Sequence, residues 1–114
     1  MLPLEGISEP LYSTLGGDPE MGELIAAFVE RIPGRRRTLC DLFAEANWPE
    51  LERAAHQLKG AAGSYGFDLL TAAAAQLEKA VKSREDLAVI RLSLESVAVC
   101  CERCRAGASN PLER

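Results

Sequence analysis

The sequence predicts an all-α protein, an antiparallel up-down four-helix bundle with a short N-terminal helix. Hydrophobic residues make up 47% of the chain, and because Ala and Leu dominate while aromatics contribute only 5%, the composition favours closely packed helices over a sheet. Apolar residues recur at spacings of three and four through four consecutive segments, which is the pattern of amphipathic helices. The turns between these segments are short, so each helix is expected to pack antiparallel to the next. The 114 residues suffice for one such domain, with no need for a disulfide or metal to hold its core.

The N-terminal part of the chain is expected to be irregular. Residues 1–18 form a segment in which one short helix is predicted, over residues 8–15. Asp18 then marks the start of the first bundle helix, because its side chain can cap the helix, Pro19 suits the first turn, and Glu20 favours the positive end of the helix dipole.

A long first helix is predicted to pass through Pro33. The apolar register continues across this proline without a shift, so we expect one long helix kinked at Pro33, or two helices nearly in line. The residues that carry the register are Met21, Ile25, Phe28, Ile32, Leu39, Leu42 and Ala46.

The second helix is expected to run from Trp48 to about Tyr65. Asn47 caps its start, and Gly66 fits the left-handed residue that ends it. Its apolar stripe is Leu51, Ala55, Leu58, Ala62 and Tyr65.

Two further helices complete the predicted bundle. The third runs from Phe67 or Asp68 to Lys82, and the last begins near Ser83 and Asp86, which have the spacing of a capping box. The third is expected to bury Leu70, Ala73, Leu77 and Ala80, and the last Leu87, Ile90, Leu94, Val97, Cys101 and Cys104. The bundle would then span residues 19–106, and residues 107–114 would form a frayed tail.

Charge and hydropathy narrow the class of protein. The net charge of −4 argues against nucleic-acid binding, since no basic face is large enough to neutralise several phosphates. No apolar run approaches the ~20 residues that span a bilayer, and the start of the chain lacks the charged and apolar regions of a signal peptide. We therefore expect a cytoplasmic monomer that meets other proteins and neither a membrane nor a nucleic acid.

Four cysteines raise the question of a thiol or metal site. They are Cys40, Cys100, Cys101 and Cys104. Adjacent cysteines within a helix make poor disulfide partners, and zinc usually takes two separated pairs of ligands where this chain offers one. Reduced thiols that serve as small core side chains, with no metal, are the expected state. A structural or thiol-based metal-binding bundle that adds His56 to the three clustered cysteines is the alternative.

The single histidine, His56, is expected on the outer face of the second helix. On a helical wheel it falls near 140° from the centre of the apolar stripe, with Gly60 near 180° and Gly63 near 120°, at about 100° per residue. A glycine in an exposed helix costs ~1 kcal/mol against alanine, so two of them beside a histidine indicate a floor kept clear for an approaching partner. Lys59 lies between this face and the core stripe.

The segment around His56 carries a resemblance to a known family. Residues 56–66 read His-Gln-Leu-Lys-Gly-Ala-Ala-Gly-Ser-Tyr-Gly, which resembles the signature of histidine-containing phosphotransfer (HPt) domains: His, any residue, an aliphatic residue, Lys, Gly, two small residues and Gly. The resemblance extends over residues 11–105. It includes Gly17-Asp18-Pro19-Glu20, Phe28 with Pro33, Asn47-Trp48 and Leu77-Glu78.

The resemblance implies a phosphorelay function. Such domains accept a phosphoryl group from the aspartyl-phosphate of a receiver domain, in a response regulator or a hybrid histidine kinase, and pass it to another receiver aspartate. It implies that Nε2 of His56 attacks phosphorus, that Lys59 steadies the phosphoryl oxygens and that Gly60 leaves room for the receiver. The receiver is expected to supply Mg²⁺, so the chain itself should bind no cofactor.

Most other residues near the motif have two interpretations. Glu78 would accept a hydrogen bond from Nδ1–H of His56, or would be a solvated surface carboxylate. Gln57 and Ser64 would contact phosphate, or be plain surface residues, and Arg53 would assist docking. The run at residues 35–37 would be solvated, or form a docking patch for an acidic surface.

An autonomous kinase is the remaining alternative. The sequence has no glycine-rich nucleotide loop and no Asp or Asn constellation for Mg-ATP. We therefore expect a phosphotransfer module that acts only with a partner and has no ATP site of its own.

Overall fold

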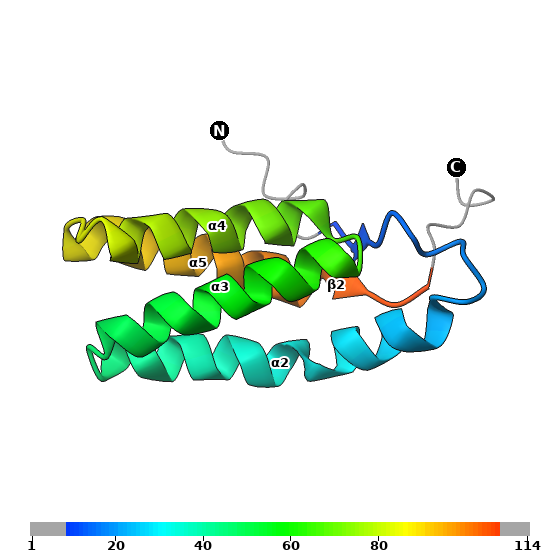
Figure 1. Ribbon diagram of the computed structural model, residues 1–114, viewed down its shortest axis with the longest axis horizontal. Helices are drawn as coiled ribbons and strands as arrows, with labels where there is room; N and C mark the ends of the chain where they lie inside the picture. The colour runs from blue at the N-terminus through cyan, green and yellow to red at the C-terminus, as the bar shows by residue number, and fades with distance from the viewer. Residues whose placement is uncertain (1–8, 108–114) are drawn as a thin grey trace.

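A computed structural model describes residues 9–107 of the chain. Its elements follow in the order β1 (Leu11–Tyr12), α2 (Gly22–Ala44), α3 (Trp48–Ser64), α4 (Asp68–Lys82), α5 (Leu87–Arg103) and β2 (Cys104–Arg105). The four helices lie along the long axis of the molecule and alternate in direction, as the colours of Figure 1 show.

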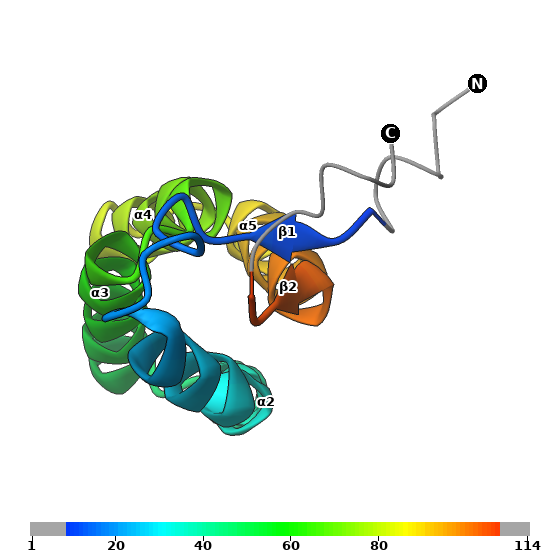
Figure 2. The same ribbon diagram turned by 90° about the vertical axis from the view of Figure 1, so that its right-hand side faces the viewer.

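The helices surround one core. Each packs against its neighbour in sequence, and α5 returns to pack against α2, which closes the bundle. Figure 2, which looks along the helices, shows the four around a common centre. The predicted all-α up-down four-helix bundle is confirmed.

Pro33 lies inside α2, which continues unbroken through it. A proline within a helix cannot donate the backbone hydrogen bond to the residue four positions earlier, and its ring crowds that carbonyl, so the helix bends. Figure 1 shows α2 changing direction along its length. One long kinked helix, the first of the two expected arrangements, is the one formed.

The start of α2 differs from the prediction. The Oδ1 atom of Asp18 accepts a hydrogen bond of 2.9 Å from the backbone N–H of Glu20, and the carbonyl of Asp18 accepts another from Met21. These bonds close a turn before the helix, and α2 begins only at Gly22, with Met21 as its cap. Asp18 thus stabilises the approach to the helix and not its first turn.

Both ends of α3 are as predicted. The Asn47 Oδ1 accepts a 3.4 Å hydrogen bond from the N–H of Glu50, and Pro49 sits in the first turn. Gly66, just beyond the helix, has φ +80°. A residue with a side chain rarely adopts this conformation, so glycine is favoured here.

The segment before the bundle contains a strand where a short helix was predicted. Leu11 and Tyr12 pair in parallel with Cys104 and Arg105. Nearby, the N–H of Thr14 donates to the carbonyl of Gly66 at 2.9 Å. These partners lie far away in the chain, and they take the backbone groups that a local helix would have used. The prediction over residues 8–15 is therefore wrong for the described residues, and Ser8 lies outside them.

The core follows the predicted stripes with four local differences. Ala46, predicted to end the apolar register of the first helix, follows the end of α2 with φ +54° and is exposed. In the alanine-rich stretch of α4, Ala74 is buried and Ala73 only partly so. Leu87, predicted to be buried, is 53% exposed in the first turn of α5. Cys104 is buried, but it belongs to β2. The buried hydrophobic residues are Ile25, Phe28, Ile32, Leu39, Leu51, Ala55, Leu58, Ala62, Phe67, Leu70, Ala74, Leu77, Ala80, Val81, Ile90, Leu94, Val97, Cys101 and Cys104.

The turn between α4 and α5 does not form the predicted capping box. Ser83 closes the end of α4, and Arg84 follows with φ +56°. Asp86 occupies the N-cap position of α5, but its side chain forms no capping hydrogen bond. At the other end, residues 108–114 of the predicted tail lie outside the described residues. Among residues 9–107, no helix combines the length and apolar character needed to cross a membrane.

Candidate functional site

His56 lies in the middle of α3 on the side turned away from the core. Its side chain is 65% exposed, while the neighbouring Ala55 and Leu58 are fully buried. The apolar stripe of α3 fixes this orientation, because it must face the core and so turns position 56 outward. The predicted solvent-facing imidazole is confirmed.

The carboxylate of Glu78 on α4 contacts two side chains of α3. Its Oε2 atom lies 2.9 Å from Nδ1 of His56, and its Oε1 atom lies 2.7 Å from Nζ of Lys59. His56 and Lys59 are three positions apart and therefore lie on adjacent turns of one helix face. Glu78 was expected either to contact the imidazole or to be a solvated surface carboxylate, and the structure has the contact with the imidazole.

Glu78 is largely covered, with a side chain only 15% exposed. The hydrogen bond from Lys59 lowers the pKa of Glu78, burial opposes this, and the hydrogen bond with His56 lowers the pKa further. The net pKa is below the ordinary value of 4.5. The carboxylate is thus ionised at neutral pH and can only accept hydrogen bonds.

An ionised Glu78 fixes the proton on the imidazole. Because Oε2 can only accept, the Nδ1 atom of His56 carries the proton and donates it to the carboxylate. In neutral imidazole the other nitrogen, Nε2, then holds a free lone pair. A neutral His56 in this geometry therefore turns its unprotonated nitrogen away from Glu78.

The two glycines of the motif have different surroundings. A Cβ atom added to Gly60 would meet nothing within 4 Å, whereas one added to Gly63 would lie 3.7 Å from the Thr71 hydroxyl on α4. Gly60 thus provides the predicted open floor. Gly63 lies against the neighbouring helix, where a small residue also suits helix packing.

The remaining predicted residues form no hydrogen bond or ion pair with His56. Gln57 lines a groove between α3 and α2. Arg53 is exposed and pairs with Glu50 of the same helix at 3.8 Å. Ser64 is the exposed last residue of α3.

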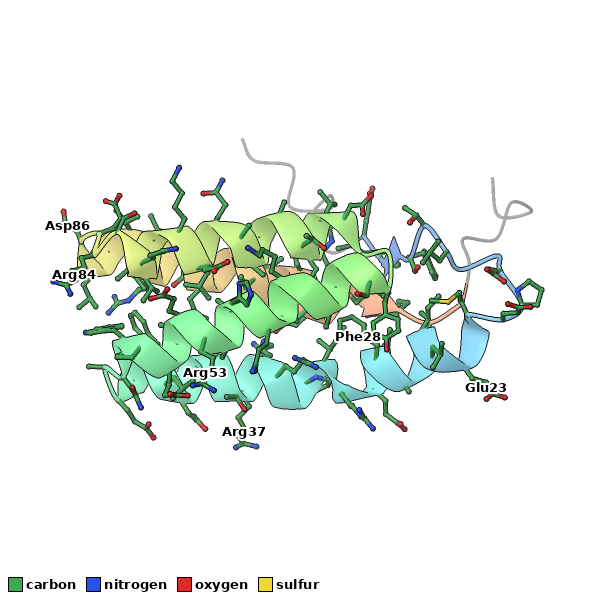
Figure 3. The ribbon with its side chains drawn as sticks, in the orientation of Figure 1. Glu23, Phe28, Arg37, Arg53, Arg84 and Asp86 are labelled. Carbon is green, nitrogen blue, oxygen red and sulfur yellow. The ribbon has the colours of Figure 1, made fainter. Side chains whose placement is uncertain are left out.

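The arginine run at residues 35–37 does not act as one patch. The half-buried Arg35 places its guanidinium carbon 5.9 Å from the centre of the Phe28 ring and lines the same groove as Gln57. Arg36 pairs with Glu102 of α5 at 2.7 Å. Arg37 points away from the bundle, as Figure 3 shows.

The four cysteines are free thiols at the contact of α2 with α5 and β2. Burial is the main cause that raises the pKa of Cys101 to about 12 and that of Cys104 to about 11, and it also raises the pKa of Cys100. Such thiols resist ionisation and behave as small core side chains. In the described part of the chain, no three His, Cys, Asp or Glu side chains are placed to share a metal ion. His56 is therefore not grouped with the clustered cysteines, as the metal-binding alternative required.

Two features of the site were not predicted from the sequence. The ion pair of Lys59 with Glu78 was missed, although both residues had been singled out separately. The position of Arg35 beside Gln57 was missed because the run had been interpreted as a unit. The helical wheel of α2 carries a signal for it, since positions 35, 36 and 37 are each about 100° apart and must face different neighbours.

A comparison with protein families agrees with the geometry. The model of the Hpt domain family matches residues 23–107, which include all four helices apart from the first residue of α2. No curated protein and no solved structure gives a significant match to the chain. Because the family match covers most of the chain and contains the exposed histidine, the chain belongs to the Hpt domain family, whose members transfer phosphoryl groups through a histidine in two-component phosphorelays.

Proposed function

We propose that His56 is the residue that accepts and donates the phosphoryl group. The observation that carries this proposal is the exposed imidazole whose Nδ1 is held 2.9 Å from an ionised carboxylate, which leaves Nε2 free beside the open floor at Gly60. His56 is also the one histidine in the chain.

The proposed step transfers a phosphoryl group from the aspartyl-phosphate of a receiver domain. The Nε2 lone pair forms the new bond to phosphorus, and the bond between phosphorus and the aspartate oxygen breaks, so that its electron pair returns to the receiver carboxylate. The imidazole gains positive charge as the bond forms. Glu78, hydrogen-bonded to Nδ1–H, stabilises that charge without removing the proton. The reverse sequence returns the group to a second receiver aspartate.

Lys59 has two tasks in this proposal. Its ammonium group balances the Glu78 carboxylate at 2.7 Å, so the phosphoryl oxygens do not meet an unpaired negative charge. An ammonium group has three donors, and those that Glu78 does not use are available to the phosphoryl oxygens. Lys59 therefore stabilises the transferred phosphoryl group while its own ammonium group stays paired with Glu78 of α4.

The partners in this proposal are receiver domains of response regulators or hybrid histidine kinases. The proposal assigns the Mg²⁺ and the acidic ligands of the reaction to the receiver, and assigns to this chain the histidine, the lysine and the clearance at Gly60. It assigns no ATP site to the chain, so ATP alone should not label it.

A labelling experiment tests the proposal. A receiver domain carrying radioactive aspartyl-phosphate is mixed with wild-type protein and with His56→Gln. Wild type should acquire a label that is lost in acid and kept in base, as expected for phosphohistidine, and the variant should acquire none. Equal labelling of a folded His56→Gln protein would show that another residue is the acceptor.

A further inference from the structure

A small groove between α2 and α3 opens beside the proposed phosphorylation site. Its volume is about 170 Å³, and its lining residues are Arg35, Thr38 and Leu39 of α2 with Ala54, Gln57 and Leu58 of α3. Gln57 follows His56 directly, so this edge of the groove lies one residue, or about 100°, around α3 from the imidazole. Pockets for small molecules usually measure ~300–1,000 Å³, and the smaller groove suits the end of a single side chain.

The position of Arg35 in the groove is fixed by aromatic packing. Its guanidinium carbon lies 5.9 Å from the centre of the Phe28 ring. Phe28 is itself 4% exposed and stacks on Tyr65 with ring centres 5.0 Å apart. A guanidinium over an aromatic face keeps the N–H groups at its edge available to a further partner. Arg35 is therefore held in place before anything binds.

The groove has an unbalanced positive charge. Among its lining residues Arg35 is charged and no carboxylate is present. No carboxylate of residues 9–107 pairs with Arg35, whereas the adjacent Arg36 pairs with Glu102 at 2.7 Å. The hydroxyl of Thr38 is already committed to the carbonyl of Gly34. A half-buried arginine in such surroundings favours a carboxylate, which can accept two parallel hydrogen bonds from it.

A contact of ordinary size centred on His56 also reaches this groove. Even a weak signalling contact of about 1,200 Å² in total covers ~600 Å² on each side, a disc of roughly 14 Å radius. Centred on His56, such a contact extends well past Gln57 and over the gap between α3 and α2. The groove thus lies within the area that such a contact would cover.

We propose that Arg35, held in the groove between α2 and α3, binds an Asp or Glu side chain on the surface of the receiver domain. This rests on the proposed function, and it adds a docking contact that selects the partner and takes no part in the chemical step. A receiver with an acidic residue facing the groove would be favoured, and one with a basic residue there would be rejected by like charge.

The experiment compares two arginines of the same run. A receiver domain that labels wild-type protein serves as the probe, and transfer is followed in Arg35→Gln and in Arg37→Gln, which removes the same charge from a side chain that points away from the bundle. At low salt, Arg35→Gln should lower kcat/KM for the phosphorylated receiver about tenfold through KM, with kcat at saturation preserved. Arg37→Gln should stay within twofold of wild type. The Arg35 effect should shrink as salt is raised, because the contact is partly open to solvent.

Controls separate docking from folding and from the reaction itself. Arg35→Lys keeps the positive charge but loses the planar fork that gives two parallel hydrogen bonds, so it should lose less efficiency than Arg35→Gln without matching wild type. A loss in both Arg35 variants together with a lower melting temperature would overturn the proposal, since it would show that Arg35 acts by packing on Phe28. Equal losses in Arg35→Gln and Arg37→Gln would also overturn it and leave His56 as the acceptor. Failure of the proposed function is recognised separately, by labelling of His56→Gln.

Discussion

Nδ1 of His56 on α3 lies 2.9 Å from Oε2 of Glu78 on α4, so the imidazole ring is oriented by a side chain of the neighbouring helix. The same carboxylate holds Lys59 through its other oxygen at 2.7 Å. The packing of α3 on α4 therefore sets the geometry of the proposed site. Substitutions at that contact should alter the rate of phosphoryl transfer even though His56 itself is kept.

Replacing Glu78 with Gln should slow phosphoryl transfer. The amide has no charge to stabilise the imidazolium or to hold Lys59, and loss of such an orienting group typically costs about ten- to hundredfold in activity. Transfer rates from a phosphorylated receiver measure the effect, and ¹⁵N NMR of the imidazole reports whether the proton still resides on Nδ1. Glu95→Gln, an exposed change on α5, is the matched control. An unchanged rate with an unchanged imidazole spectrum would contradict the role given to Glu78.

Stability should depend on pH through Glu78. Its pKa in the folded protein lies below the ordinary 4.5, so its ion pair adds stability that is present above pH 4.5 and is lost as the pH falls through the folded pKa. In urea unfolding, wild type should exceed Glu78→Gln at pH 7, and the difference should shrink below pH 4.5. Lys59→Met should reduce this pH dependence, because the hydrogen bond from Lys59 is the main cause of the lowered pKa. If the stability difference between wild type and Glu78→Gln grew toward low pH, it would contradict a lowered pKa of Glu78.

A side chain at position 60 should raise the stability of the protein and lower the rate of phosphoryl transfer. Both Gly60 and Gly34 lie in helices with nothing within 4 Å of an added Cβ, so a leucine at either position should raise stability by up to ~1 kcal/mol. Gly60→Leu should nevertheless slow transfer at least tenfold, because the side chain occupies the approach to His56. Gly34→Leu should transfer at the wild-type rate. Thermal melts and transfer kinetics on the two variants check this, and equal rates would show that the floor at Gly60 is not used.

Gly66→Ala should destabilise the bundle. A Cβ atom there would lie 2.6 Å from Oγ of Ser13 and 3.1 Å from the backbone nitrogen of Thr14, in addition to the cost of φ +80°. The left-handed conformation alone costs roughly 1–2 kcal/mol for a residue with a side chain. Gly107→Ala is the control, since its φ is +90° but nothing lies within 4 Å of the added atom. Urea unfolding should show the larger loss for Gly66→Ala, and equal losses would mean that the contact with the N-terminal segment contributes nothing.

Much of the fold follows from local chemistry. Asn47, Pro49 and Gly66 define α3 through capping and a left-handed end, and these depend only on neighbouring residues. The outward position of His56 follows from the apolar stripe beneath it. In α4 the alanine-rich stretch offers little contrast between its faces, which explains why Ala73 was predicted to be buried where Ala74 is.

The features that escaped prediction depend on partners distant in the chain. The strand at Leu11 exists because Cys104 lies beside it, and no pattern within residues 9–18 encodes that partner. The contact of His56 with Glu78 was anticipated only as one of two interpretations, because it requires the axial register of α4 against α3. Leu87 fits the apolar spacing of α5, yet it is 53% exposed in the first turn of that helix.

The pairing of β1 with β2 has a consequence for the order of folding. It joins the two ends of the described chain, and the nearby hydrogen bond from Nε of Arg103 to the carbonyl of Glu9 spans 94 residues. Closing so long a loop for a few bonds is favourable only after the helices have brought the ends together. The strand pair should therefore form last and open first, so its amides should exchange with deuterium well before those of α3 and α4.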